Sequence, residues 1–380
     1  MKFCRRKLSL FIISLCFLGI FSVMINAAPD VSVSAQSAVL LNAENGEVYY
    51  SRNAEERLPM ASTTKIMTAL VAIENSDISD TVSIDRRAVG VEGSSIYLTE
   101  GELLSMEDLL YAVLLASAND AAAAIAIEVG GSIEGFAEMM NEKARELGLK
   151  NTHFENPHGL DSEAHFTTAL DLARITAAAL ENETFAKIVS TYKTSFDGEN
   201  GTRVVINHNK LLKSYEGCIG VKTGFTKRSG RCLVSAAERD GLKLIAVTIN
   251  APDDWKDHKT MLDYGFASYH KLNFVGEKEY SISLPVIGGR DQTVLLRNTD
   301  AITAILPSHM SSEDCEIITE LPHFLYAPVE DGETVGKLIC KAGGEIIGES
   351  DITAEYSVSR AVYKKSFWQR ILDFFKGIFD

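Results

Sequence analysis

The sequence is poor in positive charge. Its 37 lysine and arginine residues stand against 52 aspartate and glutamate residues, which gives a formal net charge of −15 at pH 7. Such a chain repels a phosphate backbone and supplies no extended basic face. We therefore expect no nucleic acid among its partners.

Proline is also infrequent, with 8 residues in 380, glycine is not enriched, with 27, and the chain shows no internal repeat and no low-complexity linker. This composition excludes a collagen-like or coiled-coil protein. Hydrophobic residues make up 46% of the chain and charged residues 23%, which is too apolar for a disordered protein. At this length the composition predicts two packed domains.

The first 27 residues have the pattern of a secretory signal peptide. Four basic residues within the first seven precede an almost wholly apolar run from 8 to 25, and small residues follow at Ala27 and Ala28. We predict cleavage after Ala27, which leaves a mature chain of net charge −19 that works outside the cytoplasm. The alternative is a retained membrane anchor, because the apolar run is nearly long enough to span a bilayer.

Four cysteines remain after that cleavage, namely Cys218, Cys232, Cys315 and Cys340. An oxidising compartment permits disulfides. Cys218 and Cys232 flank a predicted turn unequally, with a stagger of about 20 Å, which is too far for a disulfide. We expect both to be buried thiols, whereas the sequence leaves the state of Cys315 and Cys340 open.

Residues 30–273 have the pattern of an α+β domain. A β-hairpin is predicted at 38–50, with Asn45-Gly46 in its turn. A mainly helical stretch follows from Ser62 to about Leu180. Helix caps and helix ends are expected at Ser105, Thr168, Gly130-Gly131 and Gly148.

Strand character returns in the second half of this domain. Because strands lie near both of its ends, we expect a sheet that the two chain ends complete. The predicted strands are 203–206, 219–225, 231–236 and 244–249, followed by a helix at 254–269.

The composition changes near residue 275. Between 280 and 358, short alternating runs are separated by glycine and proline, which is typical of a small all-β domain. We place this domain at 276–360.

The pattern of residues 363–380 predicts an amphipathic helix. Basic residues precede it and lie on its polar face, which gives a local charge of +2 in an acidic chain. A helix of this kind lies in a membrane interface, so we expect the mature protein to be peripheral on the outer face of the plasma membrane. The alternative is a helix packed on the protein. The apolar arc comprises Phe367, Trp368, Ile371, Leu372, Phe374, Phe375, Ile378 and Phe379.

The spacing Ser62-x-x-Lys65 places a hydroxyl and an amine on one face of a helix. The amine can then accept the serine proton and activate the oxygen as a nucleophile. A helix N-terminus also offers backbone N–H groups to a developing oxyanion. The motif alone is weak, because it recurs at Ser190–Lys193 and Ser268–Lys271.

The order of three motifs selects one serine. Ser62 is the only one of these serines that precedes both Ser117-Ala-Asn119, after a predicted helix, and Lys222-Thr-Gly224, on a predicted strand. Ser51-Arg-Asn53 repeats the second motif by chance, but Lys-Thr-Gly occurs once. The ordered set is the one found in β-lactamases and penicillin-binding proteins.

The chain resembles the serine-type D-alanyl-D-alanine carboxypeptidases, the low-molecular-mass penicillin-binding proteins. The matching segments are 59–65, 117–122, 156–161 and 220–226, and the resemblance covers nearly the whole mature chain. It implies an antiparallel sheet flanked by helices, then a β-rich domain and an amphipathic anchor. It also implies removal of the terminal D-alanine from the pentapeptide stem of peptidoglycan through an acyl-enzyme, with β-lactam antibiotics acylating the same serine.

The resemblance also assigns roles to the motif residues. Ser62 is the implied nucleophile and Lys65 its base, while Ser117 relays a proton toward the leaving amine. Asn119 holds Lys65 and the substrate amide in place.

The implied substrate-binding residues lie on one strand. Lys222 supplies positive potential for the substrate carboxylate, the Thr223 hydroxyl is its hydrogen-bond partner, and Gly224 lets the substrate backbone lie against the strand edge. The implied oxyanion hole consists of the backbone N–H groups of Ser62 and Phe225. Some relatives carry histidine in place of Phe225, which leaves the efficiency of deacylation open.

Three histidines near the third segment, His153, His158 and His165, match no helical zinc pattern. We therefore expect no metal ion, and no cofactor.

Three other functions remain to be compared with the carboxypeptidase. A β-lactamase of class A requires a Glu-x-x-Leu-Asn segment, which the chain lacks. A D,D-endopeptidase that cuts cross-links uses the same nucleophile and stays open, as does a non-catalytic wall-binding scaffold. The β-domain is expected to be a spacer toward the wall or a docking surface.

Overall fold

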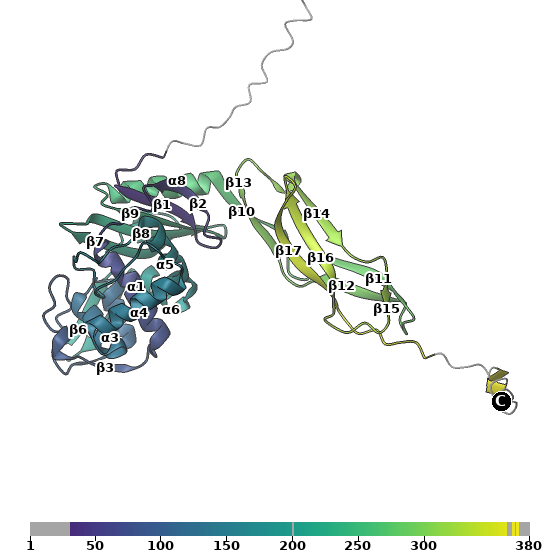
Figure 1. Ribbon diagram of the computed structural model, residues 1–380, viewed down its shortest axis with the longest axis horizontal. Coiled ribbons are helices and arrows are strands. Elements are labelled where there is room, and N and C mark those ends of the chain that lie inside the picture. Colours follow the sequence, from purple (N-terminus) through teal and green to yellow (C-terminus); the bar gives the residue numbers. More distant parts are fainter. Residues whose placement is uncertain (1–30, 200, 363–366, 369, 372–380) are drawn as a thin grey trace, which may run out of the picture. The chain divides into compact units, whose positions relative to one another are not determined.

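The computed structural model describes residues 31–199, 201–362, 367–368 and 370–371 (Figure 1). The predicted signal peptide and most of the predicted C-terminal helix lie outside these residues, so both stay predictions. Within the described residues, every helix falls short of the length and apolarity needed to cross a bilayer.

The first part of the described chain is built on a five-stranded sheet in the order β2-β1-β9-β8-β7. Each neighbouring pair is antiparallel, and β1 near the start of the chain pairs with β9, so the two ends complete the sheet as predicted. The hairpin and the later strands are confirmed within a few residues. The bounds are β1 Ser37–Asn42, β2 Val48–Arg52, β7 Cys218–Thr226, β8 Gly230–Arg239 and β9 Leu242–Ile249.

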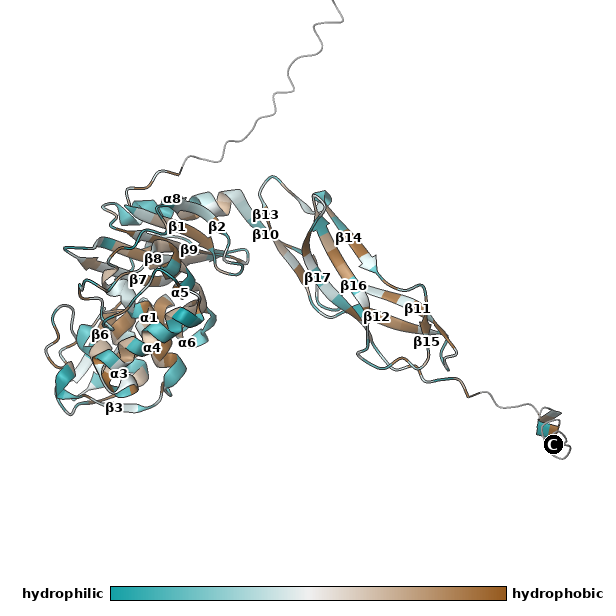
Figure 2. Cartoon of the chain, in the orientation of Figure 1, coloured by the Kyte–Doolittle hydropathy of each residue, from teal (hydrophilic) through white to brown (hydrophobic). Residues whose placement is uncertain are grey.

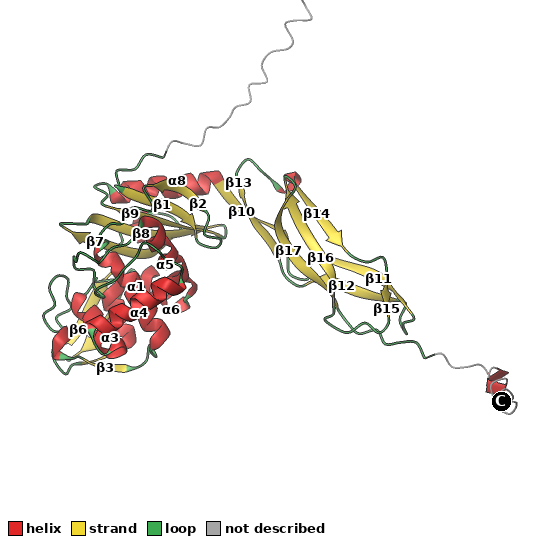
Figure 3. Cartoon of the chain, in the orientation of Figure 1, coloured by secondary structure: helices red, strands yellow, loops and turns green. Residues whose placement is uncertain are grey.

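Both faces of this sheet are covered by helices (Figure 3). Alternate residues of β1 point to opposite faces, so Val39 and Leu41 belong to the core under the main helical cluster, whereas Ala38 and Leu40 pack with Met261 of the single helix α8. Figure 2 shows hydrophobic segments along these strands. The helices are α1 Lys65–Asn75, α2 Met106–Leu114, α3 Asn119–Gly130, α4 Ile133–Glu146, α5 Ala169–Glu181, α6 Glu183–Ser190, α7 Leu211–Ser214 and α8 Asp254–Ser268.

The predicted caps are confirmed. The hydroxyl groups of Ser105 and Thr168 accept the backbone N–H groups of Asp108 and Asp171 and begin α2 and α5. Gly131 ends α3 in the left-handed conformation that glycine adopts without strain, with φ +73°.

The prediction of a mainly helical stretch from Ser62 to Leu180 is wrong for two segments. Residues 76–105 form loops around the short 3₁₀ helix η2 Arg86–Ala88 and the two-stranded sheet of β3 Thr81–Ser83 and β4 Leu103–Ser105. The second segment, 147–168, is also irregular. Glycines at 90, 93 and 101 have positive φ angles, which breaks the helical path in the first segment. A further hairpin, β5 Lys193–Gly198 with β6 Gly201–Ile206, follows α6.

The chain after residue 268 is rich in β-strands, in agreement with the predicted all-β domain. The described strands form a pair, β10-β13, and a six-stranded sheet in the order β14-β16-β17-β12-β11-β15 around an apolar core of its own. The boundaries predicted at 30–273 and 276–360 stay predictions. The strands are β10 Tyr269–Val275, β11 Ser281–Ile287, β12 Thr293–Asn298, β13 Ile302–Pro307, β14 Cys315–Glu320, β15 Leu325–Tyr326, β16 Thr334–Ala342 and β17 Glu345–Ala354, with the 3₁₀ helix η3 at Ser312–Asp314.

The strand register confirms that Cys218 and Cys232 are too far apart for a disulfide. Cys232 lies opposite Gly224, several residues along β7 from Cys218. Cys232 is buried as expected, but Cys218 is only partly buried because it stands at the start of its edge strand. Cys315 and Cys340, on β14 and β16, are free thiols as well.

Candidate active site

Ser62 lies in a short 3₁₀ turn, η1 Ala61–Thr64, that leads into α1. Helix α1 itself begins at Lys65, so the serine precedes the α-helix by one tight turn instead of opening it. Ala61 has φ +49°, a left-handed conformation that a residue with a side chain seldom adopts and that is typical of functional sites. The turn leaves Ser62 partly exposed while its neighbours Ala61 and Thr63 are buried.

Lys65 is fully buried, and three oxygen atoms surround its amine. Its Nζ lies 2.6 Å from Oδ1 of Asn119, 2.6 Å from the backbone oxygen of His158 and 3.2 Å from Oγ of Ser62. Burial, and then the charge of Lys222, hold the pKa of Lys65 well below its ordinary value. A neutral amine donates to the first two oxygens and keeps its lone pair for the Ser62 proton, as a general base requires.

Lys222 and Ser117 form a second contact on the other side of the site. Ser117, just after α2, has φ +61°, and its Oγ lies 3.0 Å from Nζ of Lys222 on β7. The same Nζ donates to the backbone oxygen of Thr223 at 2.8 Å. Burial lowers the pKa of Lys222 to about 7, so its charge is sensitive to pH near neutrality.

Strand β7 approaches the serine turn closely at Gly224. A Cβ atom at this position would lie 3.0 Å from the backbone nitrogen of Ser62 and 3.1 Å from that of Thr63, so only glycine leaves space beside the nucleophile. β7 is the last strand in the sheet order, and among the described strands it pairs only with β8. Thr223 is partly exposed and Phe225 is 66% exposed along this edge. The free edge can therefore receive an extended peptide by β-augmentation.

The loop of residues 156–161 contributes backbone atoms that the sequence analysis did not identify. The side chain of Asn156 accepts the backbone N–H of Gly159 at 2.7 Å and shapes the loop. The loop then presents the backbone oxygen of His158 to Lys65 and that of Pro157 to Thr68. A carbonyl oxygen is common to every residue type, so the sequence carries no signal for this role.

The nearby histidines have partners within the protein. His165 contacts Oγ1 of Thr64 through Nε2 at 2.8 Å, and His153 contacts the backbone oxygen of Ala164. Burial lowers the pKa of His158 to about 3 and that of His165 to about 4. Among the described residues there is no group of three or more His, Cys, Asp or Glu side chains that could hold a metal ion.

Asn119, the first residue of α3, is held by the loop that precedes β4. Its backbone N–H donates to the oxygen of Ser94 at 2.7 Å, and its Nδ2 donates to the oxygen of Glu92. Gly93 lies between these two acceptors with φ +100°, and a Cβ there would meet Nδ2 of Asn119 at 2.6 Å. The sequence analysis missed this support because it comes from a loop with no motif of its own.

The structure thus brings all the predicted residues to one place. Contacts connect Ser62, Lys65 and Asn119, and a second contact connects Ser117 to Lys222. Thr223, Gly224 and Phe225 follow Lys222 along the open strand edge. The chance matches of the first motif lie elsewhere: Ser190 caps its own helix by donating to the backbone oxygen of Lys187, and Lys271 pairs with Glu44.

Comparisons with known proteins identify a family and relatives that the chain resembles. The family described as D-alanyl-D-alanine carboxypeptidase matches residues 23–253. The D-alanyl-D-alanine carboxypeptidase DacF of Bacillus subtilis is 33% identical over 341 residues, which cover 87% of this chain and 88% of the relative.

Solved structures show the same fold class as predicted. Penicillin binding protein 5 from Haemophilus influenzae superposes with a TM-score of 0.67 at 28% identity and covers 87% of this chain and 98% of its own. The Streptomyces K15 DD-transpeptidase has a TM-score of 0.60 at 33% identity and covers 62% of this chain and 98% of its own.

Proposed function

The chain belongs to the D-alanyl-D-alanine carboxypeptidase family, and from this premise we propose that it removes the terminal D-alanine of peptidoglycan stem peptides through an acyl-enzyme on Ser62. It is a serine-type carboxypeptidase, and the observation that carries the assignment of the nucleophile is the position of the Lys65 amine. That amine is buried, it lies 3.2 Å from Oγ of Ser62, and two other oxygens fix its direction.

Acylation begins when the Lys65 amine takes the proton of Ser62. Oγ then attacks the carbonyl carbon of the penultimate D-alanine, and the backbone N–H groups of Ser62 and Phe225 receive the oxyanion. Ser117 relays to the nitrogen of the leaving D-alanine the proton that Lys65 took from Ser62, so that Lys65 and Ser117 regain their starting protonation as the C–N bond breaks. Water next attacks the carbonyl carbon of the acyl-enzyme ester and gives a proton to the Lys65 amine, which passes it to Oγ of Ser62 as the ester bond breaks.

Substrate is held on the open edge of β7. Lys222 supplies positive charge for the terminal carboxylate, the Thr223 hydroxyl donates to it, and Gly224 leaves room for the peptide backbone. Asn119 holds the substrate amide while its Oδ1 keeps Lys65 in place.

The intact mass of the protein, lacking residues 1–27 and 363–380, tests this function. After addition of benzylpenicillin we expect a long-lived adduct on the parent and none on Ser62→Ala, and the parent alone releases D-alanine from a D-Ala-D-Ala peptide. Absence of both the adduct and the release contradicts the proposal and puts the non-catalytic scaffold first.

The same experiment separates the related activities. An adduct that disappears within seconds while penicillin is consumed indicates a β-lactamase. Release of monomers from cross-linked stem peptides, in preference to release of D-alanine, indicates an endopeptidase. Neither alternative is favoured by the relatives, whose names describe D-alanyl-D-alanine carboxypeptidases.

The location is part of the proposal. A cleaved signal peptide and a basic amphipathic helix at 363–380 fit a protein that is secreted and bound to the outer face of the plasma membrane. Truncation after Val362 is expected to release the protein from membranes without changing its kinetics. Continued sedimentation with membranes contradicts the helical anchor and favours a retained N-terminal segment.

The β-domain fits a spacer between this anchor and the catalytic domain, or a docking surface. Its deletion, with the tail kept, is expected to impair wall processing in cells while hydrolysis of a soluble peptide is retained. Loss of soluble activity would instead identify the domain as structural support.

A further inference from the structure

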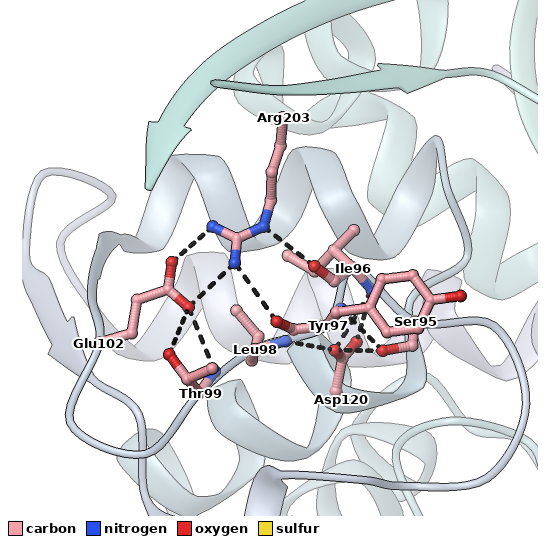
Figure 4. Close-up of polar contacts among 8 residues, drawn as sticks. All are labelled: Ser95, Ile96, Tyr97, Leu98, Thr99, Glu102, Asp120 and Arg203. Atoms are coloured by element: carbon pink, nitrogen blue, oxygen red, sulfur yellow. Dashed lines mark hydrogen bonds and ion pairs between the residues drawn. The ribbon is translucent and has the colours of Figure 1, made fainter. Parts of the chain in front are cut away.

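The loop of residues 94–102, here called the clamp loop, lies between η2 and β4. Two side chains from other elements form hydrogen bonds with its backbone (Figure 4). One side is held by Asp120 of α3 and the other by Arg203 of the β5–β6 hairpin. The two side chains come from elements more than 80 residues apart in sequence, yet they bind consecutive backbone groups of the same loop.

Asp120 binds the hydrogen-bond donors of the clamp loop. Its carboxylate accepts the Ser95 hydroxyl at 2.6 Å and the backbone N–H groups of Ile96 and Leu98 at 3.2 and 3.0 Å. The side chain is only 1% exposed and stands in the first turn of α3, where a negative charge is favourable. Asp120 is therefore fully engaged in fixing the loop backbone.

Arg203 binds the acceptors of the same loop. Its Nε donates to the backbone oxygen of Ile96 at 2.9 Å and its Nη2 to that of Tyr97 at 3.4 Å. Both terminal nitrogens also pair with Glu102, whose side chain is completely buried. Burial opposes ionisation of Glu102, but Arg203 and the backbone N–H of Thr99 lower its pKa overall, so the pair is charged.

Gly198 of the β5–β6 hairpin leaves space for the Arg203 guanidinium. A Cβ atom at Gly198 would lie 1.9 Å from Nη1 of Arg203 and 2.5 Å from Oε1 of Glu102. Residue 198 must therefore lack a side chain for the Arg203–Glu102 pair to form.

The clamp loop is continuous with the support of Asn119. The backbone oxygen of Ser94, at the start of the loop, accepts the Asn119 N–H, and Oδ1 of Asn119 in turn accepts the Lys65 amine. Asn119 also directly precedes Asp120 in α3. The position of the loop is therefore coupled to that of the Lys65 amine through Asn119.

The clamp also maintains a strained residue. Tyr97 has φ +59° and its side chain is 83% exposed, so its own packing does not compensate for the left-handed backbone. Its two neighbours, Ile96 and Leu98, donate to Asp120, and its own oxygen accepts from Arg203. Strain of this kind persists only where the surroundings over-determine the conformation.

We propose that Arg203 is a positioning residue for catalysis: with Glu102 and Asp120 it fixes the clamp loop, and through Ser94 and Asn119 it keeps the Lys65 amine beside Ser62. The proposal rests on the carboxypeptidase function proposed above. It assigns a role in the reaction to a hairpin that carries none of the sequence motifs.

The test uses Arg203→Met and Glu102→Gln in the full mature chain, with rates expressed per penicillin-titratable site. We expect kcat/KM for D-Ala release to fall at least about tenfold in each, because small displacements of a catalytic group have large effects on rate. The double variant should lose no more than either single variant, since the two residues act as one pair.

A pH profile separates positioning from simple destabilisation. Water admitted to Lys65 raises its pKa, so the acid limb of kcat/KM should move to higher pH by about 0.5 unit or more. The ionisable groups that interact with Lys65 are Lys222, Asp120, His158 and His165, and all four are left intact. Arg203→Lys, which keeps the charge but loses the planar fork, should recover only part of the activity.

Two further variants complete the test. Gly198→Ala displaces the Arg203 guanidinium without removing it and should reproduce the shifted acid limb. If Arg203→Met does not fold, this variant tests the positioning role of Arg203 in its place. Arg87→Met is the matched control, because the Arg87 guanidinium contacts Asp85 and the backbone oxygen of Gly131, neither of which belongs to the clamp loop. It should leave kcat/KM and the pH profile unchanged.

Two results overturn the inference. One is wild-type kcat/KM in the Arg203 and Glu102 variants, and the other is a loss that follows thermal stability with an unmoved acid limb. Failure of the wild-type chain to form the penicillin adduct would instead reject the proposed function, so the two failures are distinguishable.

Discussion

The catalytic part of the molecule and the β-rich part differ in the polar side chains that they bury. In residues 31–275 the buried residues include the ionisable Lys65 and Lys222, which lie in the candidate active site, Glu102 of the clamp loop, and Asp120, which binds that loop. In the described residues 276–362 the buried polar side chains are Asn298 and Ser350, and neither is charged. Burying an ionisable group costs free energy unless its partners compensate, so the catalytic part depends on the contacts of these four side chains, whereas the described β-rich part buries no Lys, Arg, His, Asp or Glu side chain.

The largest effect should come from removing the buried Lys65 amine of the catalytic part. Lys65→Ala leaves Ser62 without a base, and we expect kcat/KM for D-Ala release to fall about 10²–10⁴-fold. The measurement is D-alanine release at saturating and limiting peptide. Lys187→Ala, which removes a surface lysine paired with Glu107, is the matched control and should be neutral. Equal losses in the two variants would contradict the assignment of the base.

A second change tests the loop that carries Asn119. Gly93→Ala places a methyl group where Nδ2 of Asn119 lies, at 2.6 Å, so we expect kcat/KM to fall about tenfold or more. Gly90→Ala is a close control, because Gly90 also has a positive φ but its Cβ would meet nothing within 4 Å. It should cost about 1 kcal/mol of stability with no loss of rate. Similar rates in both variants would show that the loop does not position Asn119.

Substitutions in the core of the β-rich part should lower the free energy of unfolding and leave the rate of acylation unchanged. Leu338→Ala removes a fully buried side chain from its apolar core, and we expect the free energy of unfolding to fall by about 2–5 kcal/mol. Ile317→Ala, at a position that is 46% exposed, should change it much less. Thermal unfolding and the rate of penicillin acylation are measured on the same samples. A slower acylation in Leu338→Ala would show that the two regions are coupled.

The smallest effect is a dependence on pH near neutrality. Burial lowers the pKa of Lys222 to about 7, so its positive charge is lost as the pH rises through that value and the attraction for a substrate carboxylate weakens. We expect KM to rise several-fold on the alkaline side. In Lys222→Arg the charge persists, because guanidinium does not deprotonate in this range, and the rise in KM should move to higher pH. An unchanged profile would indicate that another group sets the alkaline limb.

Local rules predicted a large share of the fold. The hairpin at Asn45-Gly46, the caps at Ser105 and Thr168 and the helix end at Gly131 each depend on residues close in sequence. The motif residues were also found, because Ser62 and Lys65 are one turn apart and the order of the three motifs is specific. Sequence alone could therefore identify the residues that meet at the candidate active site, whereas their roles as nucleophile and base stay predictions.

What the sequence could not show depends on distant backbone atoms. The carbonyl of His158 reaches Lys65 across 93 residues, and Arg203 reaches Ile96 across 107. A carbonyl group belongs to every residue, and an arginine in a hairpin is ordinarily a solvated surface residue, so neither position has a composition that marks it. The helical pattern also failed at 76–105, where glycines with positive φ angles redirect the chain into the loop that holds Asn119.

The open edge of β7 has a further consequence for how the protein behaves in concentrated solution. An unpaired strand at the end of a sheet offers its N–H and C=O groups to any extended chain, and proteins commonly protect such edges against aggregation. Here the edge carries the exposed Phe225 and has no further strand beside it among the described residues, as the proposed binding of substrate requires. If the proposed stem peptide binds along this edge, it also covers a surface prone to self-association, and we then expect substrate to reduce aggregation of the protein.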